Sequence, residues 1–130
     1  MTKSELSETI ETIEESYEFF LAYAAQGAAG EAAVRQDGQV RQFLERSDEA
    51  LGALEHGLPE MIDGEGLEPA APYREMASVV MRDARDARAA VRLVLAQTAI
   101  SSQLIDNLNA STHVRAVLTD LFLLDEALTG

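Results

Sequence analysis

Residues 6–24 read LSETIETIEESYEFFLAYA, and the spacing of their apolar side chains decides the fold class. These side chains recur at steps of four and three residues, which places them on one side of an α-helix. They form a predicted seam of Leu6, Ile10, Ile13, Tyr17, Phe20 and Ala24. Thr2 and Glu5 precede the seam with the spacing of a helix-capping box. We therefore predict a helix over residues 4–26 that packs along one face.

The same periodicity occurs three more times, and strand-like alternation of Val, Ile and Thr is absent from the sequence. It predicts helices over 38–58, 72–108 and 112–128. Gly57 and Pro59 are expected to end the first of these. Four helices with one apolar stripe each predict an all-α four-helix bundle, up-down antiparallel, with a long third helix.

The third predicted helix contains AISSQ (99–103), where a bend or a break is expected. The chain has 130 residues, which is enough for one domain, 1–130, with a single core. The glycine-containing segments 27–38 and 56–72 are expected to be long loops that connect the helices.

The overall charge narrows the classes of partner. The chain has 23 acidic against 10 basic residues and a formal net charge of -13, so it repels nucleic-acid phosphates and anionic lipid. We therefore expect no nucleic-acid partner and no membrane partner. The acidity itself fits either solubility or adaptation to salt.

Missing residue types exclude several chemistries. The chain has no cysteine, so it has no disulfide framework, thiolate nucleophile or cysteine-ligated metal. No apolar run reaches the length of a membrane span, and the N-terminus lacks the pattern of a signal peptide, so a cytoplasmic location is expected.

Charged residues gather on particular helix faces. Opposite the first seam lies a row of carboxylates: Glu8, Glu11, Glu15 and Glu18. The third predicted helix carries a basic stripe of Arg82, Arg85, Arg88 and Arg92. This stripe is either a solvated face, with Arg82 and Asp86 as a local pair, or a surface that docks on carboxylates of the same chain or of a second copy.

The helix count and the many glutamates resemble ferritin-like or bacterioferritin-like proteins in architecture. The resemblance implies a di-iron site built from inward glutamates and two Glu-x-x-His motifs. Those motifs are absent, because Ala53 and Ala110 stand three residues before His56 and His113. Asp83 and Asp125 are the acids predicted closest to the core, where a tyrosine hydroxyl or an arginine is the more common partner. We predict no metal site and no cofactor.

Nucleophilic catalysis is not indicated either. Ser111, Thr112 and His113 are adjacent, but this pattern is what the N-terminus of a helix requires. We expect Ser111 or Thr112 to cap the fourth predicted helix, and we predict no catalytic residue.

Two predicted helices carry more apolar surface than one core can cover. On the helical projection Phe19 and Tyr23 lie on the flank of the first helix, and Phe122 and Leu123 lie on the flank and far side of the last. Side chains in such positions are typical of a second interface. The alternative is that the loops cover them.

Together these patterns predict a non-catalytic helical protein for protein–protein interaction or assembly, most simply a homodimer. Two alternatives stay open. One is a ferritin-like metal-binding or redox protein with degenerate ligands. The other is a helical small-molecule sensor or carrier with a pocket lined by Tyr17, Phe20 and Met76.

Overall fold

The computed structural model describes residues 1–27 and 31–130, without the side chains of residues 31–36. Within this part of the chain there are five α-helices and no strand. The helices are α1 (Lys3–Gln26), α2 (Glu31–Gly64), α3 (Ala70–Leu95), α4 (Ser102–Ala110) and α5 (His113–Thr129). The predicted all-α class is confirmed, but the fold is not strictly a four-helix bundle.

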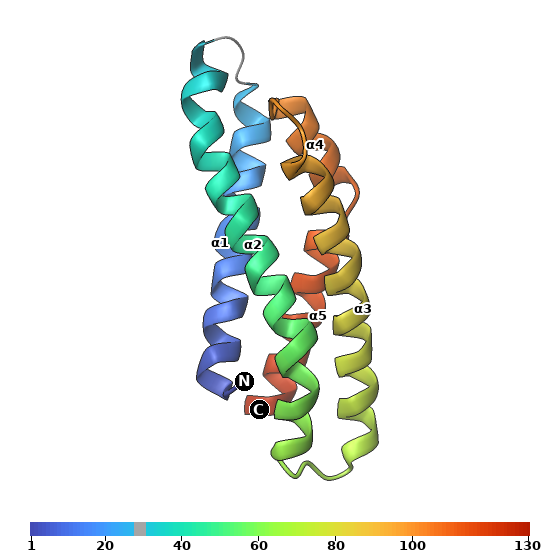
Figure 1. Ribbon diagram of the computed structural model, residues 1–130. Helices are drawn as coiled ribbons and strands as arrows, with labels where there is room; N and C mark the ends of the chain where they lie inside the picture. Colours follow the sequence, from blue (N-terminus) through green and yellow to red (C-terminus); the bar gives the residue numbers. More distant parts are fainter. Residues whose placement is uncertain (28–30) are drawn as a thin grey trace.

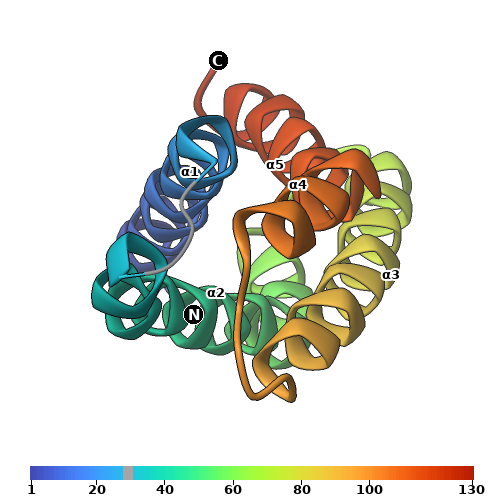
Figure 2. The same ribbon diagram turned by 90° about the horizontal axis from the view of Figure 1, so that it is seen from above.

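Four of the helices surround a common core. Figure 1 shows α1, α2, α3 and α5 running alternately up and down, with both termini at the lower end. Seen from above in Figure 2, these helices occupy the four sides of the molecule. The short α4 packs at the upper end against α1, α3 and α5. The antiparallel arrangement follows from the short connections between consecutive helices.

The predicted apolar stripes converge in one core. The seam residues Leu6, Ile13 and Phe20 are each at most 1% exposed. The seam departs from the prediction at one place, where Ser16 is fully buried and Tyr17 is only partly buried. The Ser16 hydroxyl is satisfied inside the helix, because it donates a 2.7 Å hydrogen bond to the Thr12 carbonyl.

The predicted helix over 72–108 is two helices, and the break falls between Leu95 and Ser102, at the expected segment. Ser101 caps α4, since its side chain accepts from the Leu104 amide at 3.0 Å. Ile100, within the break, is 2% exposed and anchors the connection in the core.

The carbonyls that follow α3 are satisfied by an arginine from α2. The Arg41 guanidinium donates to the Leu95, Gln97 and Thr98 carbonyls at 3.3, 2.7 and 3.1 Å. Asp37 holds this guanidinium in place through a 2.7 Å bond to Nε. The end of α3 is therefore fixed by a distant charged side chain, which helical periodicity does not reveal.

The prediction that Gly57 and Pro59 end the second helix is wrong, because α2 continues to Gly64 with Pro59 inside it. Beyond the proline, Met61 and Ile62 are 5% and 3% exposed, so their burial favours the helical path despite the lost hydrogen bond. Gly57 serves packing instead, because a Cβ there would lie 2.8 Å from the Met1 side chain.

The predicted loop over 27–38 is also shorter than expected, since α2 begins at Glu31; residues 28–30 lie outside the described part. The predicted loop over 56–72 is limited to residues 65–69. No helix in the described part of the chain is long and apolar enough to cross a membrane.

Candidate functional site

An apolar hollow lies between the start of α3 and the end of α5. Its volume is about 340 Å³, and it is lined by Pro69, Pro72, Tyr73, Met76, Leu123, Leu124 and Ala127. Leu123 is 63% exposed and its neighbour Phe122 is 48% exposed. The seam residues of α5 take the inward positions, so Phe122 and Leu123 are left on its outer side. We call Tyr73, Met76, Leu123 and Ala127 the docking face, because they line the hollow; Phe122 is exposed but does not line it.

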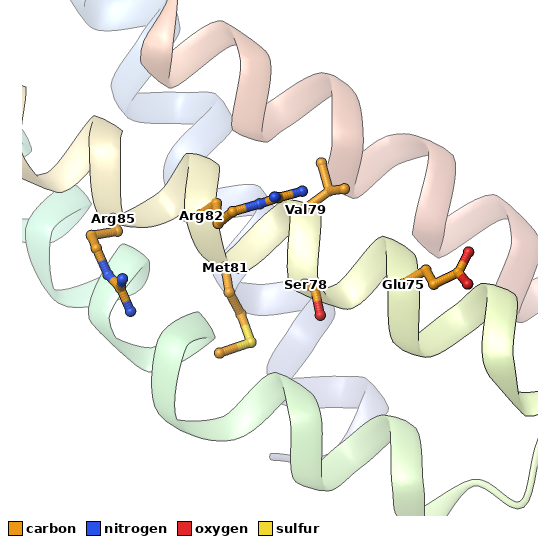
Figure 3. A pocket seen from close by; sticks show the side chains of 6 residues that line it. All are labelled: Glu75, Ser78, Val79, Met81, Arg82 and Arg85. Atoms are coloured by element: carbon orange, nitrogen blue, oxygen red, sulfur yellow. The ribbon is translucent and has the colours of Figure 1, made fainter.

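Beside the docking face runs the outer ridge of α3. A shallow hollow of about 480 Å³ on this ridge is lined by Glu75, Ser78, Val79, Met81, Arg82 and Arg85. Figure 3 shows Val79 and Arg82 on the side of α3 next to α5, and Met81 and Arg85 on the side next to α2. The docking face and the ridge are continuous, because Met76 lies one helical turn before Val79.

The predicted basic stripe divides into two parts. Arg88 and Arg92 both donate from Nε to the same oxygen of Asp48 on α2, at 2.8 and 2.9 Å. Burial alone would raise the pKa of Asp48, but hydrogen bonds and charge from the two arginines lower it below its ordinary value overall. These arginines join α3 to α2, whereas Arg82 and Arg85 are exposed on the ridge.

The Arg88 guanidinium lies against Gly52 of α2. A Cβ on Gly52 would lie 2.8 Å from Arg88 Nη1, so only a residue without a side chain leaves this position free. Gly38, in the same helix, has nothing within 4 Å of the corresponding point.

We therefore expect Gly38→Ala and Gly52→Ala to differ in sign. Gly38→Ala should raise the free energy of unfolding by about 0.5–1 kcal/mol, because alanine favours a helix. Gly52→Ala should lose this gain or reverse it, because Arg88 must move away from Asp48. Urea unfolding of both variants checks this, and the gain should return for Gly52→Ala in an Arg88→Ala background. A stabilising Gly52→Ala in the wild-type background would contradict the assigned contact.

Two residues predicted to face a partner are covered by the protein itself. Tyr23 is 2% exposed, and its hydroxyl donates a 2.6 Å hydrogen bond to the Ile100 carbonyl. Burial, and the negative charge of Asp37, raise the pKa of this phenol. Phe19 is partly buried and stacks on Phe43 of α2 with ring centroids 4.4 Å apart.

Tyr23 is thus corrected from an interface residue to a core residue. The connection that precedes α4 contacts Tyr23, and the sequence pattern does not predict that this connection lies near α1. Phe122 and Leu123 keep the exposure that the sequence predicts.

Two carboxyl groups meet between α3 and α5. Asp83, an acid predicted near the core, lies next to Asp120 of α5. Burial, and then the hydrogen bond and charge of Asp83, raise the pKa of Asp120 to about 7. Among the described residues no donor reaches the buried Asp120 Oδ2, and this agrees with a carboxyl group that keeps its proton more firmly than usual.

Asp120 was not predicted. It precedes the seam residue Leu121 and belongs to the side of α5 that turns toward α3. Periodicity shows that it is near the seam, but the partner depends on how two helices are aligned, which a single sequence does not show.

The remaining candidate residues for metal binding or catalysis do not come together in one site. His56 and His113 are both exposed. Thr112 takes the N-cap position of α5, but its side chain makes no capping bond, and Ser111 donates to the Leu108 carbonyl at 2.6 Å. Within residues 1–27 and 31–130, no group of three or more His, Cys, Asp or Glu side chains could hold a metal ion.

The small-molecule pocket that the sequence predicts between Tyr17, Phe20 and Met76 does not form. Phe20 is fully buried in the core, and Met76 lines the hollow with the other residues of the docking face.

No protein-family model, curated protein or solved structure matches the chain. What the chain shares with ferritin-like proteins is helical architecture, and membership of that family is not shown.

Proposed function

We propose that this protein is a non-catalytic interaction or assembly protein that docks another protein surface, in the first place a second copy of itself, through the docking face. The observation that carries the proposal is Leu123, which is 63% exposed beside a 340 Å³ apolar hollow. Exposed leucines are common singly, but one that lines an apolar hollow is typical of an interface.

The physical basis is burial of apolar surface. Covering a leucine side chain contributes about 1.5–3 kcal/mol, and a two-fold symmetric contact uses each residue twice. Interfaces are most apolar at their centre and polar at the rim. The docking face has this composition, because Glu68 and Glu126 are exposed next to its apolar residues.

We expect Leu123→Asp to raise the dimer dissociation constant by at least about 100-fold, because each copy then buries a carboxylate within the contact. Sedimentation velocity of wild type and variant over a range of concentrations measures this. Leu93→Asp is the matched control, since Leu93 is 66% exposed at the far end of α3. It should leave the dissociation constant within about threefold of wild type. Equal effects of the two substitutions, or a wild type that stays monomeric at high micromolar concentration, would contradict the homodimer.

One observation favours a second candidate function. The volume of the hollow, about 340 Å³, is within the range of small-molecule pockets, and its lining is apolar. A carrier or sensor of a small apolar compound would use the same residues. A thermal-shift screen separates the two functions, because a ligand of this hollow should stabilise wild type and not Leu123→Asp.

A further inference from the structure

The proposed homodimer leaves open how two copies are oriented, and the outer ridge of α3 carries a charge pattern that bears on this. Glu75 and Arg82 both line the ridge hollow and are both exposed. They are seven residues apart, so they lie on the same side of α3, two turns or about 10 Å from each other. Figure 3 shows them on either side of Val79.

Neither charged side chain forms an ion pair within the described part of the chain. Among the described residues no ion-pair partner lies within 4.0 Å of Glu75 or Arg82. Two later arginines of the helix, Arg88 and Arg92, are by contrast paired with Asp48. The acid and the base on the ridge are therefore available to another molecule.

Opposite charges at equal distances from a central point are self-complementary. A two-fold axis through the ridge between Ser78 and Val79 would place Glu75 of one copy opposite Arg82 of the other, and the reverse contact would follow by symmetry. The same axis packs the α3 helices of the two copies against each other in antiparallel orientation. Ser78 is small and exposed, so the two helices can approach closely at the axis.

The axis also agrees with the apolar part of the contact. Met76 lies one turn before Val79, and it lines the same hollow as Leu123. Two copies packed around this axis therefore place the docking face of each copy beside the contact, one on either side of the axis. The net charge of -13 makes two copies repel each other overall. We therefore expect the reciprocal charge pairs to set the register of the contact more than its strength.

We propose that the partner seated on the docking face is a second copy, packed antiparallel along α3 about a two-fold axis at Ser78–Val79, with Glu75 of each copy paired to Arg82 of the other. This inference rests on the proposed function. It adds the orientation and the residues that set it.

Charge reversal tests the arrangement without disturbing the core. Glu75→Arg alone and Arg82→Glu alone each place two like charges in contact twice per dimer, so each should raise the dimer dissociation constant by about tenfold or more. An equimolar mixture of the two variants contains only opposite pairs in the mixed dimer. It should associate within about threefold of wild type, as should the double variant.

Asp86→Arg is the matched control for Glu75→Arg, because it makes the same change of net charge on the same helix. In the proposed register Asp86 faces Ala71 of the partner, so its reversal should change the dissociation constant by less than about threefold. A strong effect of Asp86→Arg would overturn the register and indicate an Arg82–Asp86 contact instead.

Sedimentation velocity of wild type, the charge variants, their mixture and Leu123→Asp separates the two proposals. If Leu123→Asp abolishes the dimer but the mixture associates no better than either charge variant alone, the antiparallel arrangement is wrong and the docking face stands. If wild type is monomeric throughout, both are wrong.

Discussion

Replacing Tyr23 by alanine should lower the free energy of unfolding by about 3–5 kcal/mol, because a fully covered aromatic ring is removed from the core. Tyr23 is 2% exposed and also supplies the donor for the Ile100 carbonyl, so the variant loses packing and a buried hydrogen bond together. Urea unfolding followed by circular dichroism measures the loss. Tyr23→Phe should cost about 1–2 kcal/mol, since only the hydrogen bond is lost.

Tyr17 provides the matched control for this prediction. It belongs to the same helix, but it is only partly buried at the edge of the core. Tyr17→Ala should therefore cost at least about 1.5 kcal/mol less than Tyr23→Ala. If Tyr23→Ala cost under about 1 kcal/mol and converted dimer to monomer, Tyr23 would belong to the interface after all.

Replacing Asp120 by asparagine should raise the free energy of unfolding at pH 8 by about 1–2 kcal/mol and have little effect at pH 4. The pKa of Asp120 is raised from 3.8 to about 7 in the folded protein. Between these values the folded state holds a proton that the unfolded state releases, so wild-type stability falls as the pH rises through this window. A neutral amide escapes this loss and can still donate to Asp83.

The expected magnitude follows from the size of the pKa shift and from partial exposure. One unit of pKa corresponds to about 1.4 kcal/mol, but solvent screens a carboxyl that is only partly buried. Thermal or urea unfolding at several pH values gives the difference between the proteins. Asp86→Asn, at an exposed position of α3, should stay within about 0.5 kcal/mol of wild type throughout. A wild type whose stability rises from pH 5 to pH 8 relative to Asp120→Asn would contradict the raised pKa of Asp120.

The sequence predicted well what depends on one helix at a time. The seam of α1, the start of α1 at Thr2 and the exposure of Phe122 and Leu123 all follow from helical periodicity. The break near Ile100 was also indicated, by the polar residues that follow it.

The predictions from the sequence are wrong where segments that are distant in the chain come into contact. Tyr23 is buried because the segment before α4 crosses over it, and Arg88 is neutralised because Gly52 and Asp48 face it from another helix. Pro59 does not end α2, because buried residues beyond it keep the helix intact. None of these contacts has a periodicity of its own, so only the packed structure reveals them.

The central claim is that the outer surface of α3 and α5 receives a second copy, and the most direct test is the mass of the wild-type protein in solution. Sedimentation equilibrium from low to high micromolar concentration should show a concentration-dependent rise from the 14.1 kDa chain mass to twice that value. A mass that stays at 14.1 kDa over the whole range would contradict the account.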